Sequence, residues 1–112
     1  MQLTAVERFA LQMLFREQDM TSTTVRTQLD KLDVVTRKTT EVGFFTTIRP
    51  VTSLPNDAQC QWDWNFEHRH LSHGGSFMCW LDDSGVLELE AVTHNGGWPD
   101  HFDPNDFSEQ KI

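Results

Sequence analysis

The sequence has little cysteine and no long apolar run, and both shortages limit what kind of protein this is. Only Cys60 and Cys79 occur among 112 residues. They form no C-x-x-C pair, which excludes a disulfide framework and a four-cysteine zinc site. No stretch approaches the roughly 20 apolar residues of a membrane helix. The N-terminal segment carries Glu7 and Arg8 inside its apolar stretch and lacks a cleavage site, unlike a signal peptide. We therefore expect a cytosolic (cytoplasmic) protein without membrane association, with two free, buried thiols.

Basic residues are scarce in the second part of the chain. No Lys or Arg occurs between Arg69 and Lys111. Residues 70–112 contain eight acidic residues and one basic residue, a net charge of −7, whereas the whole chain has a net charge of −8. A nucleic-acid-binding face needs basic groups to meet phosphates, so the sequence disfavours direct nucleic-acid binding and none is expected. The imbalance favours a basic protein partner attracted by electrostatic steering.

Motifs of enzymes and nucleotide-binding proteins are also missing. The segments "HGGSF" and "NGGWPD" match neither a phosphate-binding loop nor a dinucleotide fingerprint, and no G-x-S-x-G elbow is present. Cys79 lies between Met78 and Trp80, and such burial without a cationic neighbour makes a thiol inert. Glu88 and Glu90 are suited to acid–base catalysis only inside a pocket, and their alternation is more typical of a solvated strand face. The sequence therefore does not favour an enzyme, and no cofactor is predicted.

What the sequence does contain fits one domain over residues 1–112, with 38% apolar and 11% aromatic residues. Thr4 and Glu7 form a capping box ahead of an apolar stripe at helical spacing, which predicts a helix over residues 5–18 that packs on a sheet. Residues 20–32 give a weaker signal for a second helix, because threonine lowers helix propensity.

Extended patterns follow the helical part. Period-2 alternation and β-branched residues predict strands at about residues 33–40, 43–50, 60–70, 76–82 and 86–94. The segment "SHGG" (72–75) is expected to break the chain between the third and fourth strands, and residues 95–112 are expected to form an irregular acidic tail. The fold class is therefore α+β, with one or two N-terminal helices packed on a four- to five-stranded antiparallel sheet.

The last two strands form the clearest hairpin. A three-residue loop, Asp83 to Gly85, places Gly85 at the position that requires a positive φ. The resulting register puts apolar pairs on one face (Leu81 with Leu87, Cys79 with Leu89, Phe77 with Ala91). It puts Trp80 opposite Glu88 and Met78 opposite Glu90 on the other face. A shift of one residue would mix the two faces, so this register is favoured.

The stretch "CQWDWNFEHRH" (60–70) places His68 and His70 on one strand face. This spacing can bind a metal when a third ligand comes from elsewhere in the chain. The alternative is that both rings extend the aromatic face of Trp62, Trp64 and Phe66 as it leaves the core. A metal-binding protein or metal-dependent enzyme that uses His68 and His70 therefore stays open as an alternative.

A second candidate site is an acidic face with aromatic residues. Trp80, Glu88 and Glu90 share one side of the hairpin, and Trp98 and Asp100 follow close by in sequence. Aromatic anchors ringed by acids are typical of a protein-binding face. The alternatives are that the tail or residues 20–32 cover this face, or that it binds a small ligand or forms a homodimer.

Three segments together resemble a group of small bacterial proteins: "VGFFTTIRP" (42–50), "GGSFMCWLDDSGVLELEAVTH" (74–94) and "WPD" (98–100). Most of that group have unknown function, and some similar small acidic α+β proteins are immunity proteins beside toxin genes. The resemblance implies an α+β fold and transfers no site residues. The working hypothesis is a non-enzymatic, cytosolic protein-binding module of the immunity or antitoxin type, which neutralises a basic partner such as a nuclease toxin.

Overall fold

The computed structural model describes residues 1–55 and 60–111. It contains two α-helices, α1 (Ala5–Leu14) and α2 (Met20–Thr27), and two single 3₁₀ turns (Leu29–Lys31 and Pro104–Asp106). Its strands are β1 (Asp33–Thr40), β2 (Gly43–Arg49), β3 (Gln61–His68), β4 (Leu71–Leu81), β5 (Leu87–Thr93) and β6 (Phe107–Glu109). No helix in the described ranges is long and apolar enough to cross a membrane.

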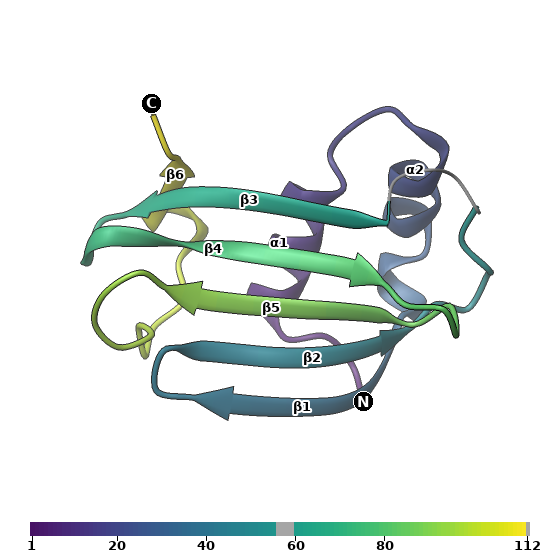
Figure 1. Cartoon of the computed structure of the whole chain (residues 1–112), viewed down its shortest axis with the longest axis horizontal. Coiled ribbons are helices and arrows are strands. Elements are labelled where there is room, and N and C mark those ends of the chain that lie inside the picture. The colour runs from purple at the N-terminus through teal and green to yellow at the C-terminus, as the bar shows by residue number, and fades with distance from the viewer. Residues whose placement is uncertain (56–59, 112) are drawn as a thin grey trace.

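All six strands join one antiparallel sheet in the order β1-β2-β5-β4-β3-β6 (Figure 1). Helices α1 and α2 lie behind the sheet in that view, and the tail crosses to the same side. The fold is therefore α+β with two layers, as the sequence predicts. The expected four to five strands are corrected to six, because β6 forms within the tail that was expected to be irregular.

Helix α1 begins where the capping box places it. The Thr4 hydroxyl accepts a hydrogen bond from the Glu7 amide, and the Glu7 carboxylate accepts one from the Thr4 amide at 2.7 Å. The helix ends at Leu14, four residues earlier than expected. The physical reason is that Arg26 of α2 donates to the carbonyl oxygens of Phe15 and Glu17, which replaces the next helical turn.

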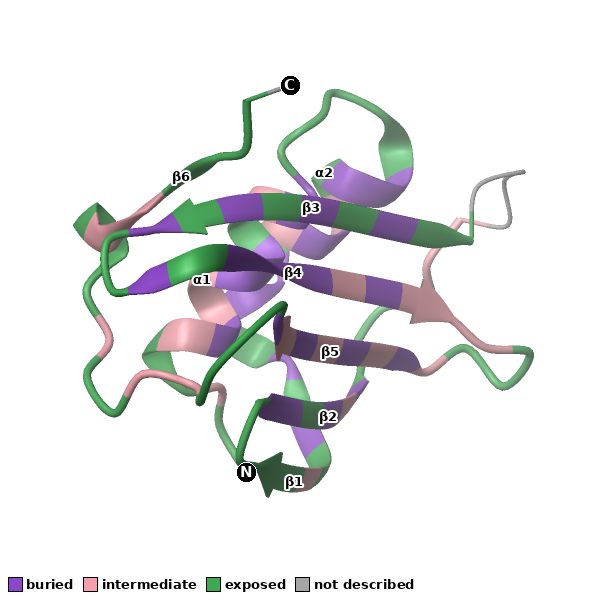
Figure 2. Ribbon diagram, turned by 60° about the vertical axis from the view of Figure 1, so that its left-hand side comes forward, coloured by how far each residue is buried: buried purple, intermediate pink, exposed green. Residues whose placement is uncertain are grey.

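The core lies between α1, α2 and the helix-side face of the sheet (Figure 2). The β4–β5 register is the predicted one, from Phe77 opposite Ala91 to Leu81 opposite Leu87. The amide of Asp82 donates to the carbonyl oxygen of Val86, and Gly85 has a φ of 84°. The hairpin prediction is therefore confirmed.

The two cysteines differ in environment. Cys79 is fully buried, and burial, followed by the charge of Glu88, raises the pKa of its thiol far above the ordinary range. Cys60 is free as expected but exposed, because it lies just ahead of β3 and not within it. The expectation of two buried thiols is corrected at Cys60.

The segment 72–75 does not interrupt the sheet. Strand β3 ends at His68, and β4 already begins at Leu71, so the predicted strands 60–70 and 76–82 are corrected to Gln61–His68 and Leu71–Leu81. Gly74 has a φ of 64°, and a Cβ there would lie 2.1 Å from the Phe66 carbonyl oxygen. At Gly75 a Cβ would lie 2.7 Å from the Phe66 ring. The glycines therefore continue the strand past Phe66 at a register shift.

Candidate functional site

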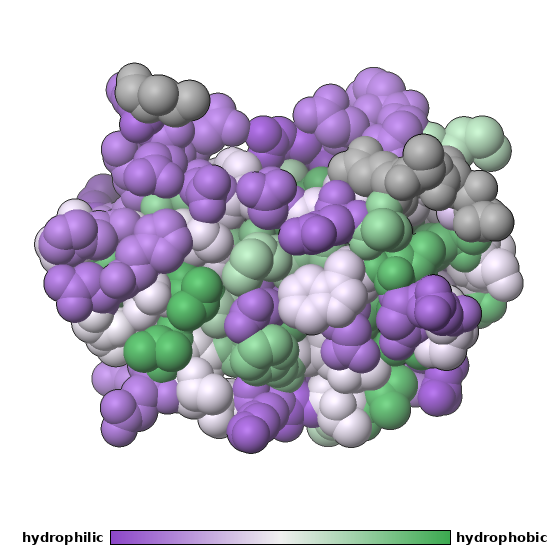
Figure 3. Space-filling model, viewed as in Figure 1, coloured by the Kyte–Doolittle hydropathy of each residue, from purple (hydrophilic) through white to green (hydrophobic). Residues whose placement is uncertain are grey.

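The face of the sheet opposite the helices has no covering layer within the described residues. The tail leaves this face free, because Phe102 and Phe107 pack on Phe9 of α1 on the other side. Helix α2 also lies on the helix side (Figure 1). The sequence left open whether the tail or residues 20–32 cover this face. In the structure neither of them does. Figure 3 looks directly onto it and shows pale and green surface between purple, hydrophilic groups.

Strand register arranges this face in two adjacent rows. One row runs Phe45, Glu90, Met78 and Asp63 across β2, β5, β4 and β3. The next row runs Thr47, Glu88, Trp80 and Gln61 across the same strands. Each glutamate of β5 therefore lies between an aromatic or apolar side chain of β4 and a β2 residue. These rows define what we call the open face.

The side chains of the open face are positioned but not buried. Phe45 is 41% exposed, and Met78, Trp80, Glu88 and Glu90 are half-buried. The Thr47 hydroxyl donates to a carboxylate oxygen of Glu88 at 2.9 Å, which fixes that side chain beside Trp80. An aromatic anchor is thus held next to a charge that remains accessible to a partner.

The charge of the open face is negative. Asp63 comes from β3, and Glu88 and Glu90 come from β5. These two strands and β4 between them contain no Lys or Arg. Basic residues enter only at the margin, where Lys38 of β1 lies opposite Phe45 and Arg49 ends β2. A surface of this kind attracts a cationic partner and repels an anionic one.

The structure separates the five residues that the sequence grouped. Trp80, Glu88 and Glu90 lie together on the open face, whereas Trp98 lies on the helix side. The Trp98 ring packs edge-on against Phe44 at 5.6 Å and contacts Phe77. Asp100 follows it on that side. Proximity in sequence was misleading here, because the chain turns around the end of the sheet after β5 (Figure 1).

Trp98 and Asp100 line a hollow of about 400 Å³ beside the N-terminus of α1. Glu7 lies at this hollow and is only 1% exposed. Arg37 donates to both Glu7 carboxylate oxygens, at 2.7 and 2.8 Å, and Thr46 donates at 2.5 Å. Burial acts to raise the pKa of Glu7, but the hydrogen bonds from Arg37, Thr46 and the Thr4 amide outweigh it, so the pKa is lowered. The carboxylate is fully bonded and serves to join α1 to the sheet.

The histidine pair lies at the end of β3, with ring centroids 5.7 Å apart. Burial lowers the pKa of His68, opposed by the charge of Asp106. His68 Nδ1 accepts a hydrogen bond from the His70 amide, and its ring packs edge-on on Phe107. This hydrogen bond occupies Nδ1, whereas Nε2 is buried and has no hydrogen-bond partner among the described residues. The described part of the chain contains no group of three His, Cys, Asp or Glu arranged to hold a metal ion.

Ser76 lies close to His94, which follows the end of β5. Ser76 Oγ is 2.8 Å from His94 Nε2, and it donates to the Asn65 side-chain oxygen at 2.6 Å. His94 Nδ1 also lies 3.2 Å from the His73 carbonyl oxygen, which can only accept, so a neutral His94 presents Nε2 to Ser76 as an acceptor. The Ser76 hydroxyl therefore has two acceptors within reach, Asn65 and His94. This polar cluster links β3, β4 and the end of β5.

Four residues of the open face were missing from the sequence analysis of that face: Phe45, Thr47, Gln61 and Asp63. Phe45 joins it through the pairing of β2 with β5, and Asp63 joins it through the pairing of β3 with β4. Both pairings are long-range and leave no local pattern beyond alternation. Met78 was placed on the correct face by the hairpin register.

Comparison of this chain with protein-family models, with curated proteins and with solved structures finds no match.

Proposed function

We propose that this chain is a non-enzymatic binding protein that uses the open face to bind a basic surface of another protein. An immunity or antitoxin-type role, in which it blocks a basic toxin such as a nuclease in the cytoplasm, fits this chemistry best. The single observation that carries the proposal is the uncovered face of β4 and β5, where Trp80 and Met78 lie between Glu88, Glu90 and Asp63.

The division of roles on this face follows from its chemistry. Trp80, Met78 and Phe45 offer apolar area that gains free energy when a partner removes it from water. The carboxylates of Glu88 and Glu90 raise the encounter rate with a cationic surface, and they disfavour anionic competitors. Nucleic acid is such a competitor, so the same face would distinguish a nuclease from the substrate of that nuclease.

The first test is site-specific photo-cross-linking in the native cell. Benzoylphenylalanine replaces Phe45 on the open face in one variant and His101 on the helix-side tail in the matched control. The proposal expects a basic protein to be captured from position 45 and not from position 101. Capture from position 101 alone would contradict it.

The second test measures association of the captured protein with purified variants. Trp80→Ala should weaken binding by roughly tenfold or more, as expected for a central aromatic anchor. The double charge reversal Glu88→Lys and Glu90→Lys should slow association, most strongly at low salt. Asp100→Lys is the control, since it reverses a charge on the opposite side of the sheet. Equal effects of both charge reversals would mean that net charge, and not this face, governs binding.

A homodimer through the open face is the competing use of the same surface. Sedimentation of the purified chain distinguishes a homodimer from binding of a different protein. A monomer at micromolar concentration supports the heterologous partner, whereas a dimer that Trp80→Ala dissociates would replace it.

A further inference from the structure

The outer edge of β3 is only partly covered by another strand. β6 pairs with Phe66 to His68, and the Gln110 amide donates to the Asn65 carbonyl oxygen at 3.0 Å. Beyond Asn65, toward the start of β3, no described strand continues this pairing. An uncovered edge next to a short strand is a place where a further extended segment can add.

The hydrogen-bond pattern shows which backbone groups face that edge. Leu81 donates to the Cys60 carbonyl oxygen on the β4 side, and Gln110 donates to Asn65 on the β6 side. Because backbone groups in a strand alternate in direction, Trp62 and Trp64 bond toward β4, and Asp63 points its N–H and C=O outward. Asp63 therefore offers one donor and one acceptor to an incoming strand.

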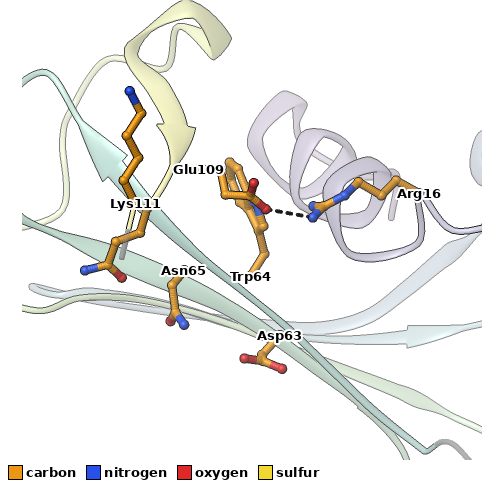
Figure 4. Close-up of a pocket in the computed structure, with 7 residues that line it drawn as sticks. Arg16, Asp63, Trp64, Asn65, Glu109 and Lys111 are labelled. Carbon is orange, nitrogen blue, oxygen red and sulfur yellow. Dashed lines mark hydrogen bonds and ion pairs between the residues drawn. The ribbon is translucent and has the colours of Figure 1, made fainter.

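Three hollows follow this edge. The largest, of about 630 Å³, lies along Asp63 to Asn65, between the end of α1 and β6 (Figure 4). Two smaller ones, of about 180 and 310 Å³, are lined by Trp62 and Trp64 respectively, and Met13 of α1 lines both. Trp62 and Trp64 are two residues apart, roughly 7 Å along a strand. That is also the spacing of alternate side chains on an added strand, so successive apolar side chains can enter the two smaller hollows.

A buried donor without an acceptor lies at this edge. Trp62 is 5% exposed, and its indole Nε1–H has no hydrogen-bond partner among the described residues. Trp62 lines the hollow that also contains Met13 and Leu14. Buried N–H groups are nearly always paired in folded proteins. The indole N–H of Trp62 is therefore an unsatisfied donor in the wall of this hollow.

The shape of the edge fits one strand better than a second copy of this chain. Figures 1 and 2 show β6 with the C-terminal segment rising past β3 at one end, and the α1–α2 loop with α2 rising at the other. Two such recessed edges cannot meet without collision of their raised ends. In addition, two copies paired about Asp63 would bring like charges together.

The charge of Asp63 indicates the sequence that would bind. Its carboxylate points to the open-face side of β3, away from Trp64 and the Arg16–Glu109 ion pair (Figure 4). No hydrogen bond or ion pair of the described residues engages this carboxylate. A Lys or Arg directly opposite Asp63 would form a favourable cross-strand pair. Residues on either side of that position would face the hollows at Trp62 and Trp64.

We propose that the outer edge of β3 binds an extended peptide segment of a protein partner by strand addition. The segment continues the line of β6, bonds to the backbone of Asp63, places a basic side chain beside the Asp63 carboxylate, and inserts apolar side chains beside Trp62 and Trp64. This site shares the Asp63 carboxylate with the open face but lies along the edge of β3, and it does not depend on the function proposed for the open face.

The test uses a display library of random peptides of about eight residues, selected against the full chain. The proposal expects enriched peptides that alternate apolar residues with Lys or Arg. Asp63→Pro should weaken their binding roughly tenfold or more, because it removes the outward N–H. The fold should survive, since proline is tolerated at edge positions whose N–H faces solvent. Asp83→Pro is the matched control, at a turn position of the β4–β5 loop that favours proline and is not part of the β3 edge.

Two further measurements keep the test decisive if Asp63→Pro does not fold. Asp63→Lys keeps the backbone and should weaken the basic peptides, whereas Asp83→Lys should not. In the unaltered chain, saturation with an enriched peptide should slow hydrogen exchange at the Asp63 amide.

Each of the following results would overturn the proposal: no enrichment, enriched peptides that bind Asp63→Pro as tightly as the unaltered chain, or unchanged exchange at Asp63. A dimer in sedimentation that Asp63→Pro dissociates would assign the edge to a second copy instead.

Discussion

Strands β4 and β5 present two faces with opposite properties. On the helix side, four side chains have no exposed area: Phe77, Cys79, Leu87 and Leu89. On the open side, their immediate neighbours are half-buried: Met78, Trp80, Glu88 and Glu90. Both sets belong to the same backbone and the same register, so alternation alone separates them. Stability and binding can therefore be changed independently, one residue at a time, within a single hairpin.

The largest expected effect compares the two faces directly. Phe77→Ala removes a fully buried ring and should lower the free energy of unfolding by about 4 kcal/mol. Trp80→Ala, three residues along the same strand, should cost less than about 1.5 kcal/mol, because its ring is partly in water already. Urea denaturation followed by circular dichroism measures both. If Trp80→Ala costs as much as Phe77→Ala, the open face is covered in solution.

Glu7 joins α1 to the covered face of the sheet. Loss of its charge should cause the next largest decrease in the free energy of unfolding. Glu7→Gln should lower the free energy of unfolding by about 2 kcal/mol, because the charged hydrogen bonds with Arg37 are replaced by neutral ones. Glu17→Gln is the control at an exposed position just beyond the end of α1. Equal destabilisation by both variants would show that the Arg37 pair contributes little.

The same carboxylate also predicts a pH dependence. The pKa of Glu7 is lower in the folded chain than in the unfolded chain. Its contribution is therefore fully present above about pH 4.3, the ordinary pKa of a glutamate, and is lost as pH falls through the lower folded value. As pH is lowered through this range, the free energy of unfolding should fall more steeply for the unaltered chain than for Glu7→Gln. Parallel curves would contradict the prediction.

The sequence predicted this molecule best where contacts are local. The hairpin register followed from alternation and from one glycine, Gly85, because a single-residue shift would have put Glu88 and Glu90 in the core. The capping box at Thr4 and Glu7 likewise marked the start of α1. In both places the partners lie within a few residues, so the pattern itself contains the structural information.

Prediction from the sequence failed where the contacting residues are far apart in the chain. Gly74 and Gly75 were interpreted as a strand break, yet they permit close approach to Phe66 of the neighbouring strand. The end of α1 depends on Arg26 in the next helix, and β6 exists only because it pairs with β3. Trp98 was assigned to the wrong face, since its place is set by packing on Phe44 and Phe77. None of these contacts has a signature in the local sequence.

A smaller effect is expected at His68, at the end of β3. Its pKa is lowered by burial, so the unfolded chain binds a proton more readily than the folded chain does. Stability should therefore fall as pH drops below about 6.5, the ordinary pKa of histidine, with Asp106 and His70 as the neighbouring charged groups. His68→Gln should remove this part of the pH dependence above the range in which Glu7 titrates. A histidine resonance at His68 that titrates at or above the ordinary value would contradict it.

The smallest effect on stability is expected on the open face, and it completes the comparison. Glu88→Gln and Glu90→Gln should each change the free energy of unfolding by no more than about 0.5 kcal/mol, because both side chains remain in contact with water. Loss of the charged acceptor for Thr47 makes Glu88→Gln the larger of the two. Association of these variants with a basic partner should nevertheless be measurably slower than that of the unaltered chain at low salt. The difference should shrink in high salt, because salt screens the charges that steer the encounter. Chemical denaturation and stopped-flow association, run on the same preparations, separate the two quantities. A loss of stability as large as that of Glu7→Gln would mean that these carboxylates hold the sheet together, and the separation of stability from binding across one hairpin would then be wrong.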